Sequence, residues 1–578
     1  MKAELVQLYT PSGERLAAEP DRIPWAAYPR PTLKRDSFLN LNGWWDFTIT
    51  RDAESVPTTY DRRIRVPYCP ESLLSGIGEV PMEGSYLWYS RSFVLPTDFQ
   101  RDRVLLHIGA ADQIAYVYVN DRYVGEHRGG YAPFTLDITD ALSGENTLSI
   151  LVVDNLKDAV LPYGKQKYKR GGMWYTPVSG IWQTVWLESV PAEYVRSLTV
   201  SVDESGATIV AEGVSDGVVT VTAPEGNILV PLQDGVARVE LLEPRLWCPT
   251  DPYLYEFTVD AGEDSVRSYF AVRTLDIRHI DGLPRMCLNG KPIFFHAVLD
   301  QGYWSDGLFT PPEPTCYAWD IQKMKELGFN TLRKHIKVEA EQFYYDCDRL
   351  GMLVWQDMVN NGHYSFLRDT ALPTIGMKKI PDAFLRRKSA TRTAFIEGME
   401  QTVHQLDKHP CIVGWTIFNE GWGQFDSDAM YGLLRGMDTT RFIDTASGWF
   451  KGAQSDVISE HVYFKPYRHR IGNKPVFLSE FGGYSYKPPE HVFNKSQTYG
   501  YRLFDRADAY MDAVEALYLQ EIIPAVQKGL CGAVYTQLSD VEDETNGLYS
   551  YDRRVCKVDA HRMQAIASQL IINAEEMG

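Results

Sequence analysis

The C-terminal half of the chain places the strongest constraint on its fold, because short apolar runs alternate there with segments of helical spacing. Apolar runs of strand length lie at 294–298, 330–333, 352–355, 412–418, 442–446, 457–459, 476–479 and 533–536. Helical spacing occurs at 314–327, 339–350, 382–408, 427–437 and 507–527, and again from 561 onward. Strands that alternate with helices form a parallel sheet, and eight such strands close into a barrel. The sequence therefore predicts a (β/α)8 barrel over residues 276–578.

Two of these predicted strands end on a glutamate. The run 412–418 leads into Asn419-Glu420, the run 476–479 leads into Glu480, and glycines follow both. A single such ending is more often a loop start or a helix cap. Barrel enzymes, however, keep their catalytic side chains at the C-terminal ends of the strands. Two carboxylates at separate strand ends are what a glycosidase needs to hold a sugar between an acid and a nucleophile, so the pair favours a glycosidase.

Other polar and aromatic residues follow the predicted strands, and in a closed barrel they would gather at the same rim. We expect the substrate to contact Asn419, Asp300, Arg333, His335, Asp357, Trp422, Trp449, His461, Tyr463 and Gln537. The same set of strand-end residues includes His296, Gln356, Ser447, Glu460 and Asp540. No His-x-x-x-His motif or carboxylate triad is present, and the acidic run 540–544 lacks the spacing of a calcium loop. We therefore expect no metal and no cofactor.

The N-terminal half reads as two all-β units. Short strands separated by turn residues over 1–190 predict a jelly-roll β-sandwich with a sugar-binding-like character. A second set over 191–275 predicts an immunoglobulin-like sandwich without catalytic residues. The loop 163–172 carries Lys165, Lys167, Lys169 and Arg170. We expect this loop to be solvated, with an arm that reaches toward the substrate as the less favoured alternative.

The composition of the chain indicates which kinds of molecule it can bind. The formal net charge of −18 argues against a nucleic-acid partner. A single substrate carboxylate would need a local basic pocket. The eight cysteines are scattered without a CxxC motif, no apolar run reaches about 20 residues, and no signal peptide is visible. We expect a cytoplasmic protein without a membrane partner that acts on a carbohydrate or glycoside, and a homo-oligomer is compatible with this interpretation.

Four further motifs carry a resemblance that spans essentially the whole chain. They are GMWYTPVSGIW at 172–182, LNGKP at 288–292, DCDRLGMLVW at 346–355 and WTIFNE at 415–420. With them the chain resembles glycoside hydrolase family 2, a family of retaining barrel glycosidases. The resemblance implies a jelly roll, an immunoglobulin-like sandwich and a (β/α)8 barrel in that order.

The resemblance also implies roles for three residues. Glu420 matches the family's acid/base, Asn419 matches the residue that bonds the sugar 2-hydroxyl, and Glu480 matches the nucleophile. The implied mechanism is double displacement with net retention. For it, the acid must stay protonated in the free enzyme and the nucleophile must stay ionised, helped by a cation such as Arg333.

The chain departs from the family in two places that bear on the sugar. Many family members carry a histidine at a fixed position after the second strand, and in the stretch RKHIKV at 333–338 the histidine stands at a different position. Family members that act on uronates usually pair an asparagine near the last strand with a lysine that binds the carboxylate, and here Asn546 has no such lysine nearby in the sequence. A neutral sugar, cleaved by an exo-acting β-galactosidase-like enzyme, is therefore our first expectation. A β-glucuronidase or β-galacturonidase, with Lys334, Lys337, Lys465 or Arg468 binding the carboxylate, is an alternative, as is an arabinofuranosidase or galactofuranosidase. A rival of another class is a non-catalytic carbohydrate-binding protein, which the presence of both glutamates disfavours.

Overall fold

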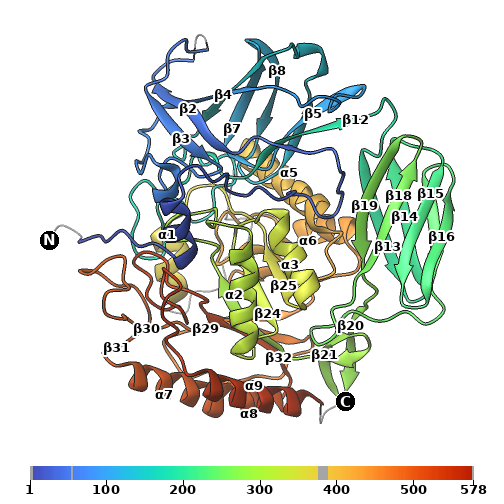
Figure 1. Cartoon of the computed structure of the whole chain (residues 1–578). Coiled ribbons are helices and arrows are strands. Elements are labelled where there is room, and N and C mark those ends of the chain that lie inside the picture. The colour runs from blue at the N-terminus through green and yellow to red at the C-terminus, as the bar shows by residue number, and fades with distance from the viewer. Residues whose placement is uncertain (1–3, 54–55, 375–387, 576–578) are drawn as a thin grey trace.

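The computed structural model describes residues 4–53, 56–374 and 388–575. Two β-rich units precede a central barrel, and the C-terminal helices pack along the barrel on the side away from the N-terminal sheets (Figure 1). This arrangement confirms the predicted fold class. The domain limits at 190/191 and 275/276 stay predictions. β12 ends at Val190 and β20 begins at Leu275.

The first unit is a sandwich of antiparallel strands. Its larger sheet has the order β3-β2-β4-β10-β7-β8, with bounds Arg62–Val66, Gly43–Thr50, Tyr86–Phe93, Asn146–Val153, Ile114–Val119 and Arg122–Arg128. The second sheet has the order β1-β12-β5-β9, with bounds Leu39–Asn40, Val185–Val190, Arg103–Ile108 and Phe134–Asp137. A short pair joins β11 (Gly180–Ile181) to β6 (Ala111–Asp112). Apolar residues of both sheets, such as Trp45 and Phe47 of β2, Leu106 of β5 and Leu187 of β12, form one core.

The second unit is a smaller antiparallel sandwich. One sheet contains β13, β14 and β17, with bounds Ser197–Asp203, Gly206–Glu212 and Val236–Glu240. The other has the order β16-β15-β18-β19, with bounds Gly226–Leu232, Gly217–Ala223, Tyr255–Ala261 and Asp264–Phe270. The sequence prediction missed β16 and β19, which are the two edge strands of this sheet.

A three-stranded sheet leads into the barrel. It contains β20 (Leu275–Ile280), β21 (Leu283–Leu288) and β22 (Lys291–Pro292). Within the described residues the barrel is an eight-stranded parallel sheet of order β27-β26-β25-β24-β23-β32-β29-β28. Its strands are β23 (Phe295–Asp300), β24 (Thr331–Lys334), β25 (Leu353–Asp357), β26 (Ile412–Asn419), β27 (Phe442–Ser447), β28 (Ile458–Val462), β29 (Val476–Gly482) and β32 (Leu530–Thr536). β27 and β28, the ends of this order, contact each other. Every predicted barrel strand is confirmed.

Helices surround the barrel. They are α1 (Pro11–Ala18), α2 (Thr315–Glu326), α3 (Glu341–Leu350), α4 (Leu372–Thr374), α5 (Ser389–Leu406), α6 (Ser427–Met437), α7 (Ala507–Leu517), α8 (Ile523–Val526) and α9 (Ala560–Glu575). Shorter turns lie at Leu73–Ser75, Thr139–Ala141, Leu367–Ala371 and Tyr518–Ile522, and the short strands β30 (Tyr484–Tyr486) and β31 (Arg502–Phe504) pair beside the barrel. Of the helix predicted at 382–408, residues 382–387 lie outside the described part of the chain.

Connections without helices matter for the site. The segments from β27 to β28 and from β28 to β29 lie wholly within the described residues, and neither contains a helix. Among the described residues, no helix is both long enough and apolar enough to cross a membrane.

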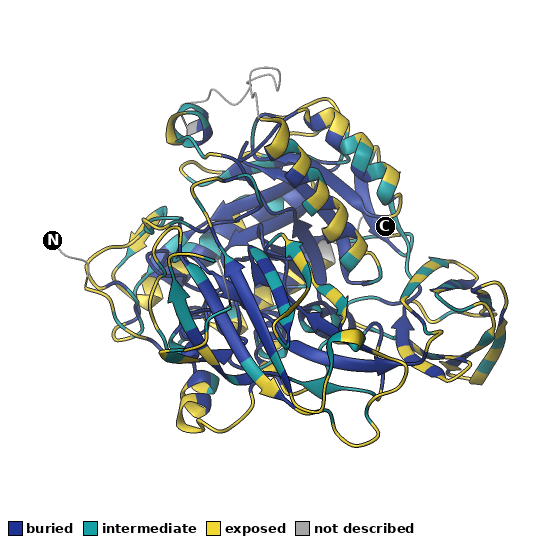
Figure 2. Ribbon diagram, turned by 90° about the horizontal axis from the view of Figure 1, so that it is seen from above, coloured by how far each residue is buried: buried dark blue, intermediate teal, exposed yellow. Residues whose placement is uncertain are grey.

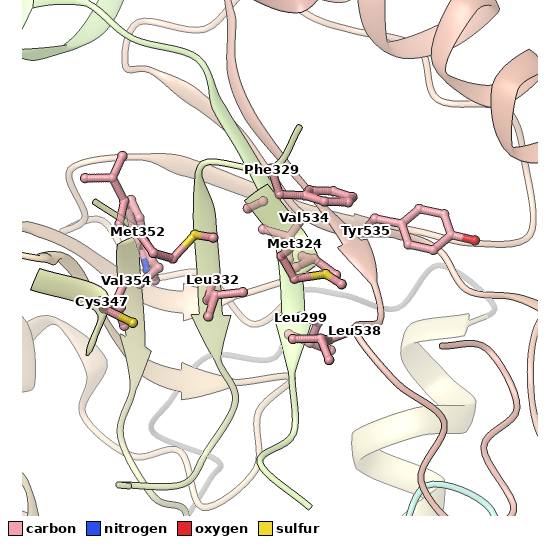
Figure 3. Close-up of a cluster of buried hydrophobic side chains, with 14 of the residues drawn as sticks. Leu299, Met324, Phe329, Leu332, Cys347, Met352, Val354, Val534, Tyr535 and Leu538 are labelled. Carbon is pink, nitrogen blue, oxygen red and sulfur yellow. The ribbon is translucent and has the colours of Figure 1, made fainter. Parts of the chain in front are cut away.

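The core of the barrel explains its stability. The barrel strands are almost entirely buried, whereas the helices expose one side (Figure 2). On the outer side of the strands, the hydrophobic core includes Met324 of α2 and Cys347 of α3 together with Leu332 and Val354 of the barrel strands (Figure 3). Inside, the ring of Trp355 stacks on Phe477 with centroids 4.5 Å apart. Fully burying a side chain of this kind contributes about 2–3 kcal/mol.

One predicted rim residue lies elsewhere. His296 is the second residue of β23, and its ring nitrogens face the Gly328 carbonyl at 2.9 Å and the Tyr518 hydroxyl at 3.1 Å. The prediction that His296 lies at a strand end was wrong, because the strand continues through Leu299 to Asp300.

Candidate active site

The two glutamates meet at the rim of the barrel. Glu420 directly follows β26 and has a left-handed backbone, with φ of 51°, and Glu480 lies within β29. Nδ1 of His461 lies 2.8 Å from Oε1 of Glu420 and 3.6 Å from Oε2 of Glu480. One carboxylate oxygen of each glutamate and one ring nitrogen of His461 all lie within 4.8 Å of one another. Both carboxyl groups therefore face the same small volume.

Glu480 is held by a cation and a phenol. Arg333 Nη1 donates to Oε1 over 3.1 Å, and the Tyr463 hydroxyl donates to Oε2. Burial raises the pKa of Glu480, whereas the Arg333 charge, the Tyr463 hydrogen bond and the Lys165 charge each oppose that rise. The environment thus counteracts the cost of ionising a buried carboxyl group.

Arg333 joins three of the predicted rim residues to one another. Its Nε and Nη2 donate to the two oxygens of Asp357, each over 3.0 Å. Nη2 also donates to Oδ1 of Asn419 over 2.9 Å, and Nη1 donates to the Ser479 carbonyl over 2.9 Å. With the bond to Glu480, every N–H of the guanidinium has an acceptor. Arg333 therefore fixes the positions of its neighbours and has no donor left for a ligand.

A hydrogen bond to the second ring nitrogen fixes the orientation of His461. Its Nε2 lies 3.0 Å from the Ser447 hydroxyl, which donates to the Ser479 hydroxyl over 2.9 Å. Behind it, a Cβ at Gly448 would lie 2.8 Å from the ring, so only glycine leaves room for the imidazole. Trp449, the next residue, donates from Nε1 to the Glu420 carbonyl over 3.0 Å.

His335 is a neutral imidazole in this site. Its Nδ1 lies 2.8 Å from Oδ2 of Asp357, and burial, with the Lys165 charge, lowers the pKa of His335 to about 3. A neutral ring whose Nδ1–H donates to a carboxylate presents Nε2 as an acceptor. His335 can therefore accept a hydrogen bond from a sugar hydroxyl.

Stacked aromatic pairs flank the carboxylates. Tyr463 stacks on Tyr501 with ring centroids 3.7 Å apart, and Trp422 stacks on Trp174 with centroids 5.3 Å apart. A Cβ at Gly483 would lie 2.4 Å from the ring of Tyr501, so this glycine permits the first pair. Tyr501 and Trp174 lie outside the barrel strands, and the sequence pattern did not indicate them as site residues.

Two predicted site residues bind elsewhere. Asp300 accepts from the Lys334 ammonium at 2.6 Å and from the Gly302 amide at 2.8 Å. Gln537 accepts from Gln301 over 2.7 Å and donates to Glu544 over 3.3 Å. Both are buried near the rim, but these hydrogen-bond partners are not the catalytic candidates.

The loop 163–172 contradicts its prediction in part. Residues 163–166 are buried, whereas Tyr168 and Lys169 are exposed. The expectation of a solvated loop was therefore wrong for Lys165, which lies between the rings of Tyr175 and Trp422. A run of lysines gives no signal of this kind, because burial here depends on how the N-terminal unit docks on the barrel.

The site contains a group of side chains whose oxygen and nitrogen atoms lie close enough together to bind a metal ion, formed by Glu420, His461 and Glu480. His461 is also hydrogen-bonded to Glu420 and to Ser447, and Glu480 accepts hydrogen bonds from Arg333 and Tyr463. The expectation of a site without a metal stays a prediction.

Comparison with known proteins places this geometry in a family. The model described as "Glycosyl hydrolases family 2, TIM barrel domain" matches residues 281–482, and "Glycosyl hydrolases family 2, sugar binding domain" matches residues 44–191. A "Beta-glucuronidase" of Paenibacillus borealis is 24% identical, with 83% of this chain and 90% of the relative covered.

Two solved structures share the fold. A β-D-glucuronidase of Dictyoglomus thermophilum is similar with a TM-score of 0.70 and 18% identity, covering 94% of this chain and 98% of that one. A GH2 β-galacturonidase of Eisenbergiella tayi bound to galacturonate is similar with a TM-score of 0.65 and 17% identity, covering 95% of this chain and 99% of that one.

Proposed function

The chain belongs to glycosyl hydrolases family 2 and is a glycoside hydrolase, and on that premise we propose that it removes terminal β-linked hexuronic acids with retention of configuration. Glu480 is the nucleophile and Glu420 is the acid/base. The enzyme is exo-acting and releases one sugar from a short oligosaccharide or a glycoside.

The separation of the carboxylates supports retention. Retaining glycosidases hold their carboxyl groups about 5–5.5 Å apart, whereas inverting enzymes leave about 6.5–9.5 Å for a water. Oxygens of Glu420 and Glu480 lie within 4.8 Å of each other, with His461 Nδ1 within 4.8 Å of both. This spacing carries the proposal, because it lies near the retaining separation and well below the inverting one.

The reaction then proceeds in two displacements. Glu480 attacks the anomeric carbon while Glu420 gives its proton to the departing glycosidic oxygen, and the aglycone leaves as an alcohol. Glu420, now a carboxylate, takes a proton from water, and the resulting oxygen nucleophile attacks the glycosyl–Glu480 ester. The sugar is released with its original configuration, and both carboxyl groups return to their starting states.

The glycone is assigned from the relatives. The sequence alone favours a neutral β-galactoside, with uronides and furanosides as alternatives. Relatives named for β-glucuronides and β-galacturonides, over most of the length of both chains, support the uronide alternative. Neutral β-galactoside hydrolysis remains the second candidate, since Asn546 has no nearby lysine in the sequence.

A panel of 4-nitrophenyl glycosides tests this proposal. It contains the β-glucuronide, β-galacturonide, β-galactoside, β-glucoside, β-mannoside, β-galactofuranoside and α-L-arabinofuranoside. We expect a uronide to dominate, Glu480→Ala to abolish its hydrolysis, and Glu400→Ala on the exposed face of α5 to leave it unchanged. A dominant neutral glycone would overturn the uronide assignment. Activity that survives in Glu480→Ala would overturn the catalytic assignment, and silence across the panel would favour a binding protein.

A further inference from the structure

The loop that carries Lys165 belongs to an arm of the N-terminal unit, residues 163–176, that is fixed to the barrel. Near its start, the Tyr163 hydroxyl donates to the Gly362 carbonyl over 2.7 Å. In its middle, Arg170 pairs with Glu542 at 3.3 Å and Asp543 at 3.0 Å, and at its end the Thr176 amide donates to Glu542 over 2.9 Å. The arm is therefore held at both ends, and the residues between them have set positions.

Lys165 lies in this arm as a largely buried side chain whose charge has no hydrogen-bond or ion-pair partner among the described residues. Its residue is 7% exposed, and its ammonium makes no hydrogen bond or ion pair with any residue that the structure describes. The ammonium lies 5.4 Å from the ring centroid of Tyr175 and 5.8 Å from that of Trp422. Aromatic faces attract a cation only weakly, and they do not replace the hydrogen bonds that a buried ammonium loses.

The ammonium faces the catalytic candidates. The charge of Lys165 lowers the pKa of His335, after burial, and it opposes the rise in the pKa of Glu480. Trp422, one of its two aromatic neighbours, also borders His335, with centroids 6.4 Å apart. Lys165 therefore stands beside the volume into which Glu480 and His335 point.

The cations at the end of β24 and just after it already have partners. Arg333 has an acceptor for every N–H. Lys337 donates to the Gly302 and Phe309 carbonyls and to Glu339, and Lys334 donates to Asp300 and Glu339. Lys465 and Arg468 are exposed. The four cations that the sequence suggested for a uronate are thus engaged elsewhere or exposed to solvent.

We propose that Lys165 binds the carboxylate of the substrate's uronic acid and so determines its specificity. This inference rests on the proposed function. The arm holds the ammonium in place before the substrate arrives, so the carboxylate supplies the partner that the protein does not. A neutral hexoside would leave the cation buried and unpaired, which is how a polar site rejects a substrate that lacks the matching group.

Substitution of Lys165 by Met tests this assignment with paired substrates. Methionine keeps the length and the aromatic contacts but removes the charge. For the better of the β-glucuronide and the β-galacturonide, we expect kcat/KM to fall about 100- to 1000-fold, mainly through KM, as when one partner of a buried charge pair is lost. For the neutral hexoside of the same configuration, we expect kcat/KM to stay within about threefold or to rise. Lys169→Met, with the same charge change at an exposed position of the arm, should alter neither substrate.

Other outcomes separate the possible failures. An equal loss on both substrates would show that Lys165 only sets the ionisation of Glu480, and no loss on either would show that it is a structural residue. Both results would overturn the inference while leaving the uronidase in place. Failure of the wild type to hydrolyse any uronide would instead overturn the proposed glycone itself.

Thermal denaturation and binding provide a second readout that does not depend on turnover. A partnerless buried ammonium does not stabilise the free protein, so Lys165→Met should have a Tm equal to or above that of the wild type. Free glucuronate or galacturonate should raise the Tm of the wild type and of Lys169→Met but not that of Lys165→Met. A variant with a lowered Tm that is still stabilised by the uronate would contradict the assignment.

Discussion

Arg333 on β24 donates a hydrogen bond of 3.1 Å to Oε1 of Glu480 on β29. Neither strand pairs with the other, since β23 and β32 lie between them in the barrel. The contact thus spans the barrel interior, and it places a permanent positive charge against a carboxyl group whose pKa burial raises.

Replacing Arg333 by Met removes that charge. The pKa of Glu480 should rise further, because the Arg333 charge opposes the effect of burial more strongly than any other neighbour does. Since only ionised Glu480 can attack the sugar, the acidic limb of kcat/KM should move to higher pH. The variant should also lose about 3–5 kcal/mol of stability, because Asp357 and Glu480 both lose the buried guanidinium with which they pair. The pH–rate profile and the Tm are compared with those of Arg122→Met, which is exposed. An unmoved acidic limb would contradict this explanation of how Glu480 stays ionised.

Glu420→Gln should affect substrates according to their leaving group. An alkoxide leaving group needs a proton, so kcat/KM on an alkyl β-glycoside should fall about 10²–10⁴-fold. A 4-nitrophenolate leaves without protonation, so that substrate should lose far less in the first step, and azide should restore its turnover by replacing activated water. The rates are followed by released alcohol and nitrophenol. Equal losses with both leaving groups would contradict an acid/base role for Glu420.

Gly448→Ala tests how tightly His461 is placed. The glycine has φ of 86°, which strains an alanine, and the added Cβ would lie 2.8 Å from the His461 ring. We expect kcat to fall at least about tenfold and stability to fall by about 1–3 kcal/mol. Gly432→Ala within α6, where a Cβ meets nothing within 4 Å, should instead stabilise the protein by about 0.5–1 kcal/mol. An unchanged kcat in Gly448→Ala would show that the position of His461 is not critical.

His296 should make the protein sensitive to mild acid. Burial lowers the pKa of His296 to about 4, below its ordinary value of 6.5. The unfolded chain therefore binds the proton first, so the stabilisation is present above pH about 6.5 and is lost as the pH falls toward 4. Between pH 7 and 5 this residue accounts for about 2 kcal/mol. His296→Gln should therefore lose less Tm between these pH values than the wild type does. An equal loss in both proteins would contradict the buried neutral imidazole.

Much of the barrel could be predicted from the sequence because each strand is buried on both faces and reads as a continuous apolar run. The runs that lead into Glu420 and Glu480 are β26 and β29 in the structure. The prediction placed the end of β23 at Val298, although the apolar residues continue through Leu299 to the polar last residue, Asp300.

The side of the site formed by the N-terminal unit could not be predicted in the same way. Periodicity describes how one segment buries its own apolar face, whereas the position of Lys165 depends on contacts between segments about 200–370 residues apart in sequence. Likewise, the stack of Tyr463 on Tyr501 depends on a loop between β30 and β31 that returns to Gly483. Neither contact leaves a local pattern.

The configuration of the first product tests the central claim most directly. Hydrolysis of the preferred 4-nitrophenyl β-glycoside is followed by proton NMR from the first turnovers, before the free sugar equilibrates between its anomers. We predict that the β-anomer appears first, because Glu480 and water attack the anomeric carbon in succession from opposite faces. Initial release of the α-anomer would mean a single displacement by water and would contradict the roles given to Glu420 and Glu480.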